Sequence, residues 1–414
     1  MSVNTTCIRT LKILIIFLIV FLHANFYSQP VKQFVTIKGG EFIDTEGRPF
    51  LLKGINLGNW LNPEGYMFHL GSVSSSRLIS DLINEAVGPE DVGKFWDAFR
   101  DNYVTREDIH FIRQCGMNSV RVPFNFRLFA DEQNPDVFYE KGFKYLDNVI
   151  EWCRAEGLYV VLDMHCAPGG QTGDNIDDSW GYPYLFRSSG MQDLTVRIWE
   201  KIALRYAGET TVIGYDLLNE PIAHYFEDKE ELNKLLEPLY KRITSAIRKI
   251  DSEHVIFLGG AQWNTNFSVF GKPFDSRLAY TFHKYWMPPV QQEIQQYVDF
   301  SRKYDVPLWL GESGENSDAW IDSFRTVLEK NKISWCFWPY KKMDSKSCMV
   351  SFSRTAEWDS LITFAKANRS TYEQIRKSRP SFSLSHKALA DMTENMKFDR
   401  CRKNENYLKA LGVK

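Results

Sequence analysis

A repeating alternation of short apolar segments and longer polar ones constrains the fold of this chain more than any other feature. Each short segment is rich in aliphatic and β-branched residues, and the stretch that follows it has helical periodicity. Alternation of this kind is typical of parallel strands joined by right-handed helical crossovers. The pattern predicts strands at 51–56, 117–122, 158–163, 212–218, 254–258, 278–282, 306–310 and 334–338.

Eight such units favour a closed (β/α)8 barrel, and a doubly wound open sheet is the competing architecture. No G-x-G-x-x-G sequence follows a predicted strand, which counts against a nucleotide-binding open sheet. Thr105 and Asp108 form a capping-box pattern at one helix start, and Gly157 marks a helix end. The predicted helices are 105–115, 139–156, 191–206, 229–249, 290–304, 317–330 and 357–368.

The amino terminus has the pattern of a secretory signal. Arg9 and Lys12 precede an apolar run at 13–22 that is too short to span a bilayer, and the small residues Ala24 and Ser28 place cleavage near Ser28. An uncleaved membrane anchor is the alternative. We expect a monomer that is secreted or held in a periplasm or at the cell surface, without membrane insertion after cleavage.

Two segments lie outside the barrel rhythm. Residues 31–48 contain Gly39-Gly40 and a Thr-Glu-Gly turn, and they predict a hairpin that closes the bottom of the barrel. Residues 372–414 are rich in Lys and Arg and have weak helical periodicity, which indicates a surface helical appendage packed on the barrel or trailing from it. The chain therefore divides into a signal peptide at 1–28, a catalytic barrel at 29–371 and the appendage at 372–414.

Composition excludes some functions. The chain of 414 residues is 44% hydrophobic and 14% aromatic, as expected for a globular protein with a large core, and its formal net charge is −2. With so little net charge there is no strong field to recruit nucleic acid, and no nucleic-acid partner is expected. Six cysteines remain after Cys7 is removed with the signal; they show no C-x-x-C spacing, and buried free thiols are the expectation for most of them.

Polar or aromatic residues follow almost every predicted strand at the same relative point. In a barrel of parallel strands, chemistry collects at the carboxyl ends of the strands. Taken alone, the Asn-Glu-Pro sequence after the fourth strand could be only a strand-to-helix turn. Recurrence at successive strand ends favours a common site instead, and the residues concerned are Asn56, Arg121, Asp163, His165, Asn219, Glu220, Gln262, Trp263, His283, Tyr285, Glu312 and Trp338.

This pattern resembles glycoside hydrolase family 5, the cellulase A family of retaining β-glycosidases on a (β/α)8 barrel. The likeness runs from about residue 51 to residue 338, and the segments "GINLGNWL" and "EGLYVVLDMHCAPGGQTG" are most similar to its exo-β-glucanase and β-glucosidase branch. Ser313 stands where many relatives carry an aromatic residue. The matching site positions are Arg121, His165, Asn219, Glu220, His283, Tyr285, Glu312 and Trp338.

The resemblance implies Glu220 as the acid/base and Glu312 as the nucleophile. Hydrolysis with retention needs two carboxyl groups roughly 5–5.5 Å apart across the scissile bond. The resemblance also implies that Arg121 and Tyr285 hydrogen-bond Glu312, with the positive charge of Arg121 favouring its ionised form. We expect a raised pKa for Glu220, because the neighbouring negative charge disfavours its ionisation.

Other members of the pattern are implied substrate contacts. His283 would orient the acid, His165 would contact the sugar, Asn219 would bind the sugar 2-hydroxyl, and Trp338 would lie under the sugar ring. Further tryptophans are candidates for additional subsites, although core packing explains each of them equally well: Trp60, Trp180, Trp263 and Trp286.

No metal or cofactor is expected. Asp174, Asp177 and Asp178 offer oxygen ligands that could bind calcium, but they lack EF-hand spacing, and a solvated loop near the substrate is the preferred interpretation. A metal-dependent barrel hydrolase would need clustered His and Asp ligands, and only His165 and His283 stand at the strand ends.

The resulting hypothesis is a secreted retaining hydrolase of β-glucan oligo- or polysaccharides, exo-acting on β-1,3 or related linkages. The long segment 167–186 could wall off one end of a cleft and favour exo action. An endo-β-1,4-glucanase is the alternative, with a β-mannanase behind it. From another class, a carbohydrate-binding barrel with a silent site would be expected to lack Glu220 or Glu312, and both are present.

Overall fold

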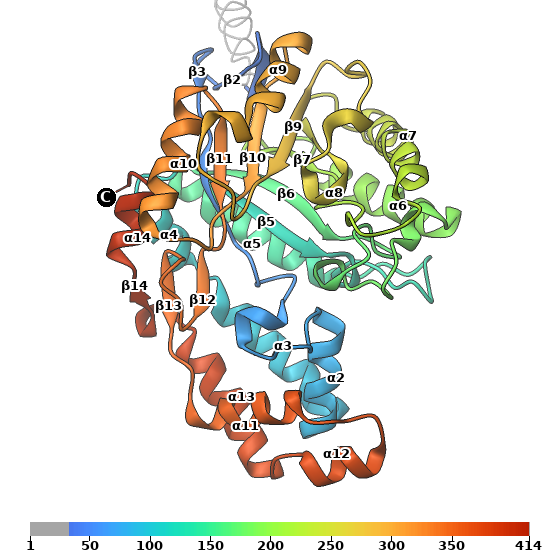
Figure 1. The fold of residues 1–414 in the computed structure, drawn as a ribbon, viewed down its shortest axis with the longest axis vertical. Helices are drawn as coiled ribbons and strands as arrows, with labels where there is room; N and C mark the ends of the chain where they lie inside the picture. Colours follow the sequence, from blue (N-terminus) through green and yellow to red (C-terminus); the bar gives the residue numbers. More distant parts are fainter. Residues whose placement is uncertain (1–32, 414) are drawn as a thin grey trace, which may run out of the picture. The chain divides into compact units, whose positions relative to one another are not determined.

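Eight parallel strands close into a barrel at the centre of the computed structural model, which describes residues 33–413 (Figure 1). The strands follow the order β10-β11-β4-β5-β6-β7-β8-β9 around the barrel. This closed barrel confirms the predicted (β/α)8 class over an open sheet, and each predicted strand has a counterpart. The strands are β4 (Lys53–Asn56), β5 (Ser119–Asn125), β6 (Tyr159–Cys166), β7 (Val212–Asp216), β8 (Val255–Gly259), β9 (Leu278–His283), β10 (Leu308–Glu312) and β11 (Ser334–Phe337).

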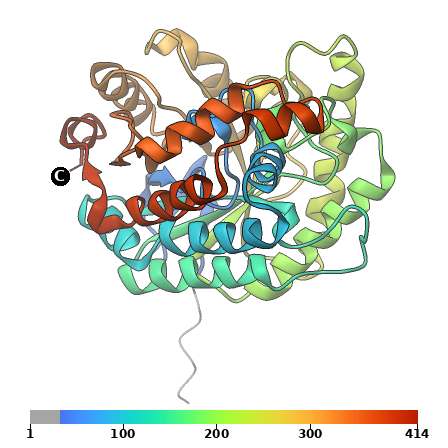
Figure 2. The ribbon, with the colours of Figure 1, turned by 90° about the horizontal axis from the view of Figure 1, so that it is seen from below.

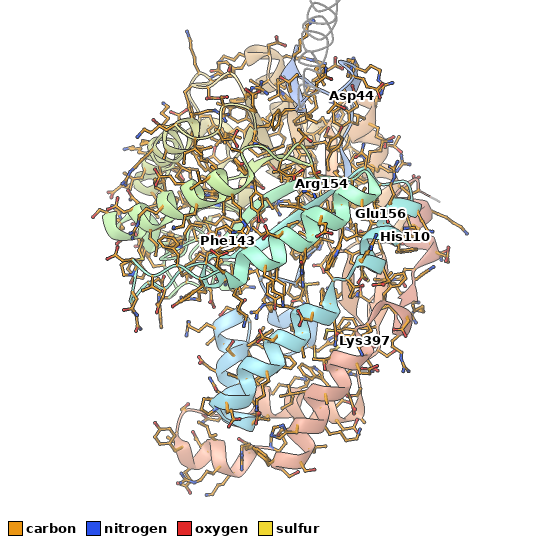
Figure 3. The ribbon with its side chains drawn as sticks, turned by 180° about the vertical axis from the view of Figure 1, so that it is seen from behind. Asp44, His110, Phe143, Arg154, Glu156 and Lys397 are labelled. Carbon is orange, nitrogen blue, oxygen red and sulfur yellow. The ribbon has the colours of Figure 1, made fainter. Side chains whose placement is uncertain are left out.

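Helices surround the barrel and bury an apolar face against it. Figure 3 shows the outer side of one of them, α5 (Lys141–Glu156), with Phe143 in its first turn and Arg154 and Glu156 in its last. The helix ends at Gly157, whose φ of 68° is the left-handed conformation that glycine adopts without strain. The other barrel helices are α4 (Arg106–Gln114), α6 (Ser189–Tyr206), α7 (Lys229–Arg248), α9 (Gln295–Tyr304) and α10 (Asp318–Lys330). The four-residue segment labelled α8 (Ala261–Asn264), after β8, is a turn with non-helical backbone at Gln262 and Trp263.

A small antiparallel sheet closes the bottom of the barrel, as predicted. It consists of β1 (Thr36–Lys38), β2 (Glu41–Ile43) and β3 (Pro49–Phe50). Phe42 stacks on Phe257 of β8 with ring centroids 5.9 Å apart, and both belong to an apolar cluster formed by the lower ends of the barrel strands. Burying such a ring contributes about 1.5–3 kcal/mol. The sheet therefore stabilises the end of the barrel that is remote from the strands' carboxyl ends.

A group of helices with partners from both ends of the sequence packs beside the barrel. The helices α2 (Ser76–Val87) and α3 (Pro89–Tyr103) follow β4 and were not predicted. Both contact α13 (Phe382–Asn395), which also packs against α11 (Ala356–Lys366), as Figures 1 and 2 show. The boundary that we placed at residue 371 thus falls between two helices that pack together.

The last residues of the described chain continue this packing. The strands β12 (Lys341–Met343), β13 (Val350–Phe352) and β14 (Arg402–Lys403) form a second small sheet, and α14 (Glu405–Ala410) packs on α10. The ammonium of Lys341 is buried, 2.8 Å from Asp108 of α4 and 2.9 Å from the carbonyl of Met396. The short elements that remain are α12 (Tyr372–Ser378), η1 (Gly65–Phe68), η2 (Phe126–Leu128), η3 (Asn175–Asp177), η4 (Tyr184–Phe186), η5 (Phe267–Val269), η6 (Gln291–Glu293) and η7 (Phe398–Arg400).

The cysteines of the described chain are all free, in agreement with the expectation of reduced thiols. Five are buried and Cys401 is half-buried. Within residues 33–413 no helix has the length and apolarity needed to cross a membrane. The predicted signal peptide at 1–28 lies outside the described residues, so its assignment stays a prediction.

Candidate active site

All eight predicted site residues come together at the carboxyl ends of the barrel strands. A cavity of about 590 Å³ opens there, and six of the eight line it: His165, Glu220, His283, Tyr285, Glu312 and Trp338. Arg121 and Asn219 do not line the cavity; both are fully buried beneath it and contact the residues that do. The predicted residues therefore divide into six that line the cavity and two that lie beneath it and contact the lining residues.

The carboxylate of Glu312 is held from both sides. Nη1 of Arg121 donates to Oε1 over 2.5 Å, and the hydroxyl of Tyr285 donates to Oε2 over 3.2 Å. The β10–β9 register shifts between Leu310 and Glu312, an irregularity of the kind that re-aims a side chain near a site. Gly311 is required at this shift, because a Cβ there would lie 2.4 Å from Oγ1 of Thr281. These contacts hold Glu312 as an oriented hydrogen-bond acceptor.

Arg121 is itself fixed by a cluster of buried acids. Its Nη2 lies 2.8 Å from Asp216 and 3.1 Å from Asp163, in addition to the contact with Glu312. Burial lowers the pKa of Arg121, but the charges of the three carboxylates outweigh this effect and raise it. Burial raises the pKa of Asp163 and of Asp216 to about 7, against the lowering effect of Arg121. Asp216 was not among the predicted site residues, although it occupies the end of β7.

Glu220 differs from Glu312 in its surroundings. Its Oε1 lies 2.8 Å from Nδ1 of His283, and burial raises its pKa to about 7, while His165 and Arg121 act in the opposite direction. The direction agrees with our expectation but the cause does not: burial, and not a neighbouring negative charge, raises the pKa. One carboxylate oxygen of Glu220 lies within 4.8 Å of one carboxylate oxygen of Glu312. That separation matches a retaining pair and is shorter than the roughly 6.5–9.5 Å of an inverting pair.

The segment that carries Glu220 is not a strand-to-helix turn. The strand β7 ends at Asp216, and the next helix begins only at Lys229. Glu220 and Ile222 have φ values of 44° and 59°, in the left-handed region that is costly for residues other than glycine. The carbonyl of Glu220 accepts from Oγ1 of Thr172 over 2.8 Å, and such contacts hold the strained conformation.

His165, Asn219 and Trp338 form one side of the site. The rings of His165 and Trp338 stack at 5.5 Å with an interplanar angle of 6°. Asn219 accepts from Nη2 of Arg121 over 2.9 Å, which leaves its amide N–H groups directed toward His165, with Nδ2 3.4 Å from Nε2. A Cβ at Gly58 would lie 2.4 Å from the Trp338 ring, so glycine in "GINLGNWL" makes room for that indole.

Two loop residues at the inner end of the cavity were missed. Glu64 is 4% exposed, and its pKa is raised well above the usual value by burial and by the charges of Glu312, Glu315 and Glu220. The hydroxyl of Tyr66 accepts from Nε1 of Trp338 over 2.8 Å. Glu64 lies in irregular chain after β4 and Tyr66 lies in the single turn η1, and both segments are too short for periodicity to indicate them.

The tryptophans that we considered for further subsites have different locations. Trp263 and the 74% exposed Trp286 line the outer part of the cavity together with His224, whose Nδ1 accepts from Nε1 of Trp263 over 3.1 Å. Trp60 belongs to the apolar core, and Trp180 lies against the guanidinium of Arg77. Of the four, Trp263 and Trp286 line the cavity.

Two of the three acidic residues in the loop at 174–178 are buried and structural, so the predicted solvated loop was wrong for Asp177 and Asp178, while Asp174 is half-buried. Asp177 and Asp178 are 1% and 2% exposed. Asp177 accepts from the backbone N–H groups of Thr172, Gly173 and Ser179. Asp178 accepts from Nε of Arg127 over 3.1 Å. Their oxygens shape the loop, which carries Asn175 and Ile176 to the cavity wall.

Ser313 takes part in the same framework. Its hydroxyl donates to the carbonyl of Lys284 over 2.7 Å, and its own carbonyl accepts from the N–H of Trp338 over 2.6 Å. A small hydroxylated residue thus links the segments after β9, β10 and β11. Glu312 beside it keeps its contacts with Arg121 and Tyr285.

A closed parallel barrel with two acidic side chains facing each other at its carboxyl end defines a barrel glycosidase fold and site. The family model described as Cellulase (glycosyl hydrolase family 5) matches residues 77–344. The chain belongs to this family.

The individual relatives are named for different glycosidase activities. The chain is 31% identical over 368 residues to a β-xylosidase of Phanerodontia chrysosporium, covering 80% of this chain and 75% of that protein. It is 27% identical over 306 residues to endoglucanase C of Acetivibrio thermocellus, with coverages of 59% and 86%. A glucan 1,3-β-glucosidase of Pichia angusta is 30% identical over 180 residues, with coverages of 42% and 41%.

Solved structures show the same fold. The rutinosidase from Aspergillus niger superposes with a TM-score of 0.57 at 15% identity, covering 71% of this chain and 90% of that one. At this identity the likeness concerns the barrel alone.

Proposed function

We propose that the protein is a retaining, exo-acting β-glycosidase that releases sugar from β-glucan oligo- or polysaccharides, with β-1,3 or related linkages as substrate. The observation that carries this proposal is the pair of carboxylates within 4.8 Å of each other, each with different hydrogen-bond partners. Two groups at this distance in unlike surroundings are what a double-displacement mechanism requires.

In the first step Glu312 attacks the anomeric carbon and Glu220 protonates the departing oxygen. Arg121 and Tyr285 donate hydrogen bonds to the two oxygens of the Glu312 carboxylate and hold it at the cavity. With a pKa of about 7, Glu220 holds its proton at the start of the reaction at mildly acidic pH. The bond between sugar and leaving group breaks as the bond between sugar and Glu312 forms.

In the second step Glu220 acts as a base. Ionised after donating its proton, it removes a proton from water as the water oxygen bonds to the anomeric carbon. The bond between that carbon and Glu312 breaks, which frees the Glu312 carboxylate and gives net retention of configuration. We assign the sugar 2-hydroxyl to Asn219, which precedes the acid in the chain: Arg121 occupies its carbonyl, and its Nδ2 has a second N–H besides the one near His165. Such a contact strengthens as positive charge develops on the ring in the transition state.

The loops at the inner end of the cavity support exo action. Asn62 connects the loop after β4 to the segment at 167–186, since its amide donates to the carbonyl of Ile176 over 2.8 Å. Glu64, Tyr66 and Glu315 also line the cavity, and Lys342 pairs with Glu315. We infer that these loops close one end of the cavity, so that a terminal sugar binds there and the rest of the substrate extends toward Trp263 and Trp286.

A β-xylosidase is a second candidate, favoured by the relative that matches over 75% of its length at 31% identity. Endo-β-1,4-glucanase and β-mannanase activities remain alternatives, the first supported by the endoglucanase relative. A silent carbohydrate-binding barrel is the alternative outside enzymes.

The deciding experiment is a time course of products from laminari-, cello- and manno-oligosaccharides and aryl β-xylosides, with the anomer of the new reducing end followed by NMR. Early β-glucose from laminari-oligosaccharides supports the proposal. Early β-xylose supports the second candidate, and mixed short oligomers indicate an endo-enzyme. No product from any substrate would contradict the enzyme assignment for these sugars and favour the silent barrel.

We also infer export of the protein through the signal-like residues 1–28, supported by the positively charged start and the short apolar run. Sequencing of the amino terminus of the mature protein tests it, with a start near Ser28 expected and an intact Met1 as the contradicting result.

A further inference from the structure

The turn after β8 contains three consecutive residues in the left-handed conformation. Gln262, Trp263 and Asn264 have φ values of 50°, 62° and 58°. None is glycine, so each costs about 1 kcal/mol or more relative to a relaxed turn. Strain of this kind persists only where the surroundings enforce it, and it often marks a functional position.

Several hydrogen bonds enforce this turn. The N–H of Gln262 donates to the carbonyl of Ile222 over 3.0 Å, and its side-chain oxygen accepts from Asn266 over 2.7 Å. The amide of Asn264 lies directly over Gly259, where a Cβ would be only 2.1 Å from Oδ1. The turn thus directs Trp263 to the cavity and the fully buried Asn264 side chain to the barrel interior.

The Asn264 amide contacts the histidine that pairs with Glu220. Its Nδ2 lies 3.1 Å from Nε2 of His283, and Nδ1 of the same ring lies 2.8 Å from Oε1 of Glu220. An amide nitrogen only donates, so Nε2 must accept, and the single proton of a neutral imidazole then resides on Nδ1. In this orientation Oδ1 of Asn264 is buried without a hydrogen-bond partner. The opposite orientation would pair that oxygen but leave both N–H donors of the amide buried without one, and buried N–H groups without a partner are rarer than carbonyl oxygens without one.

This tautomer determines which oxygen of Glu220 carries the catalytic proton. When Nδ1–H donates to Oε1, that oxygen acts as the carbonyl acceptor of the neutral acid, and the proton is placed on Oε2. Within the described chain, His283 is the hydrogen-bond partner of the Glu220 carboxylate, through Oε1. The side chain keeps 11% exposure and lines the cavity, so Oε2 is the oxygen available to a glycosidic oxygen.

We propose that Asn264 is a positioning residue that selects the Nδ1–H tautomer of His283 and thereby keeps the acid proton of Glu220 on Oε2, facing the substrate. The inference rests on the proposed function of Glu220 as the acid. With the other tautomer, Nδ1 would accept, and the proton would be drawn to Oε1, between Glu220 and His283 and away from the leaving group.

The first test does not depend on activity. In wild-type protein labelled with 15N-histidine, the side-chain nitrogen shifts of neutral His283 should show the proton on Nδ1, with the signal assigned by its loss in His283→Gln. A proton on Nε2 would overturn the proposal. This measurement remains decisive even if the protein hydrolyses none of the glycosides offered, a result that would count against the proposed function only.

The second test uses the leaving group as the readout. Asn264→Gly removes the amide but tolerates the positive φ. Its kcat/KM should fall on the order of 10–100-fold for phenyl glycosides and change little for dinitrophenyl glycosides, whose departure needs no proton. A uniform fall for all leaving groups, or no change for any, would refute the role.

Gln262→Gly provides the matched control. It loosens the same strained turn at a residue with a similar φ of 50°, whose side chain bonds to Asn233 and Asn266. The dependence of kcat/KM on the leaving group should stay as in the wild type. If the control steepened this dependence as much as Asn264→Gly, loosening of the turn would explain the effect and the proposal would fail.

Discussion

Nη1 of Arg121 lies 2.5 Å from Oε1 of Glu312, and both groups are almost fully buried. Arg121→Lys keeps the positive charge but removes the planar group that also contacts Asp216 and Asn219. We expect kcat to fall about 100–1000-fold, as for the loss of one preorganised donor, with KM less affected. Steady-state kinetics on an aryl glycoside measure this change, and activity close to the wild type would contradict the assigned contact.

Glu312→Ala should abolish turnover, with a loss on the order of 10⁴-fold or more, because no other group occupies the attacking position. The far-UV circular dichroism and the melting temperature should stay close to those of the wild type, since the site is at the barrel mouth. Trapping of the wild-type intermediate with a 2-fluoro glycoside, followed by peptide mass spectrometry, should label Glu312. Label on another residue would show that the nucleophile is misassigned.

Glu220→Gln should separate substrates by leaving group. The glutamine keeps the hydrogen bond from His283 but cannot donate an acidic proton, so glycosides with poor leaving groups should slow far more than dinitrophenyl glycosides. Azide should restore turnover of the activated substrates by replacing water at the glycosyl intermediate. The measurement is kcat/KM across the series with and without azide, and equal losses for all substrates would argue against an acid/base role.

The pH dependence of kcat/KM should report the acid. Because burial raises the pKa of Glu220 to about 7, its protonated form is abundant below that pH and is lost above it. The activity of the free enzyme should therefore decline as the pH rises through about 7. The profile of Glu220→Gln with a dinitrophenyl glycoside should lack this limb; if the limb persisted there, another group would be its source.

The same group links folding to pH. Glu220 has a pKa of about 7 in the folded protein and 4.5 when unperturbed. Protonation of Glu220 therefore makes its full contribution to the free energy of unfolding below about pH 4.5. This stabilisation is lost as the pH rises through 7. Glu220→Gln keeps a neutral group, and its melting temperature should therefore exceed that of the wild type by a few degrees at pH 8 and by less at pH 5. An equal difference at both pH values would contradict the raised pKa.

Sequence periodicity predicted the barrel well because its strands and helices are local patterns. It did not predict α2 and α3, although Ser75 caps the first and Pro89 begins the second. Their partner is α13, about 290 residues further along the chain, as the hydrogen bond from Asn102 to the carbonyl of Thr393 illustrates. No local window contains that contact.

The site residues likewise divide into those that local sequence patterns predict and those that depend on distant contacts. Residues at strand ends, such as His165 and Glu312, follow from the fold class, because parallel strands present their carboxyl ends together. Glu64 and Asn264 could not be predicted from the fold class. They reach the site from irregular backbone whose conformation depends on contacts with other segments. Asp216 was missed for a simpler reason: the predicted strand was extended to residue 218, past its observed end.

The buried ammonium of Lys341 and the pairing of β13 with β14 have a consequence for synthesis of the protein on the ribosome. Lys342, which follows Lys341 in β12, pairs with Glu315 at the cavity wall. The neighbouring strand β13 pairs with Arg402 and Lys403. The wall therefore rests on a small sheet whose outer strand is supplied by residues 402 and 403, about 50 residues further along the chain. During translation we expect this wall to form only after those residues have left the ribosome and paired with β13.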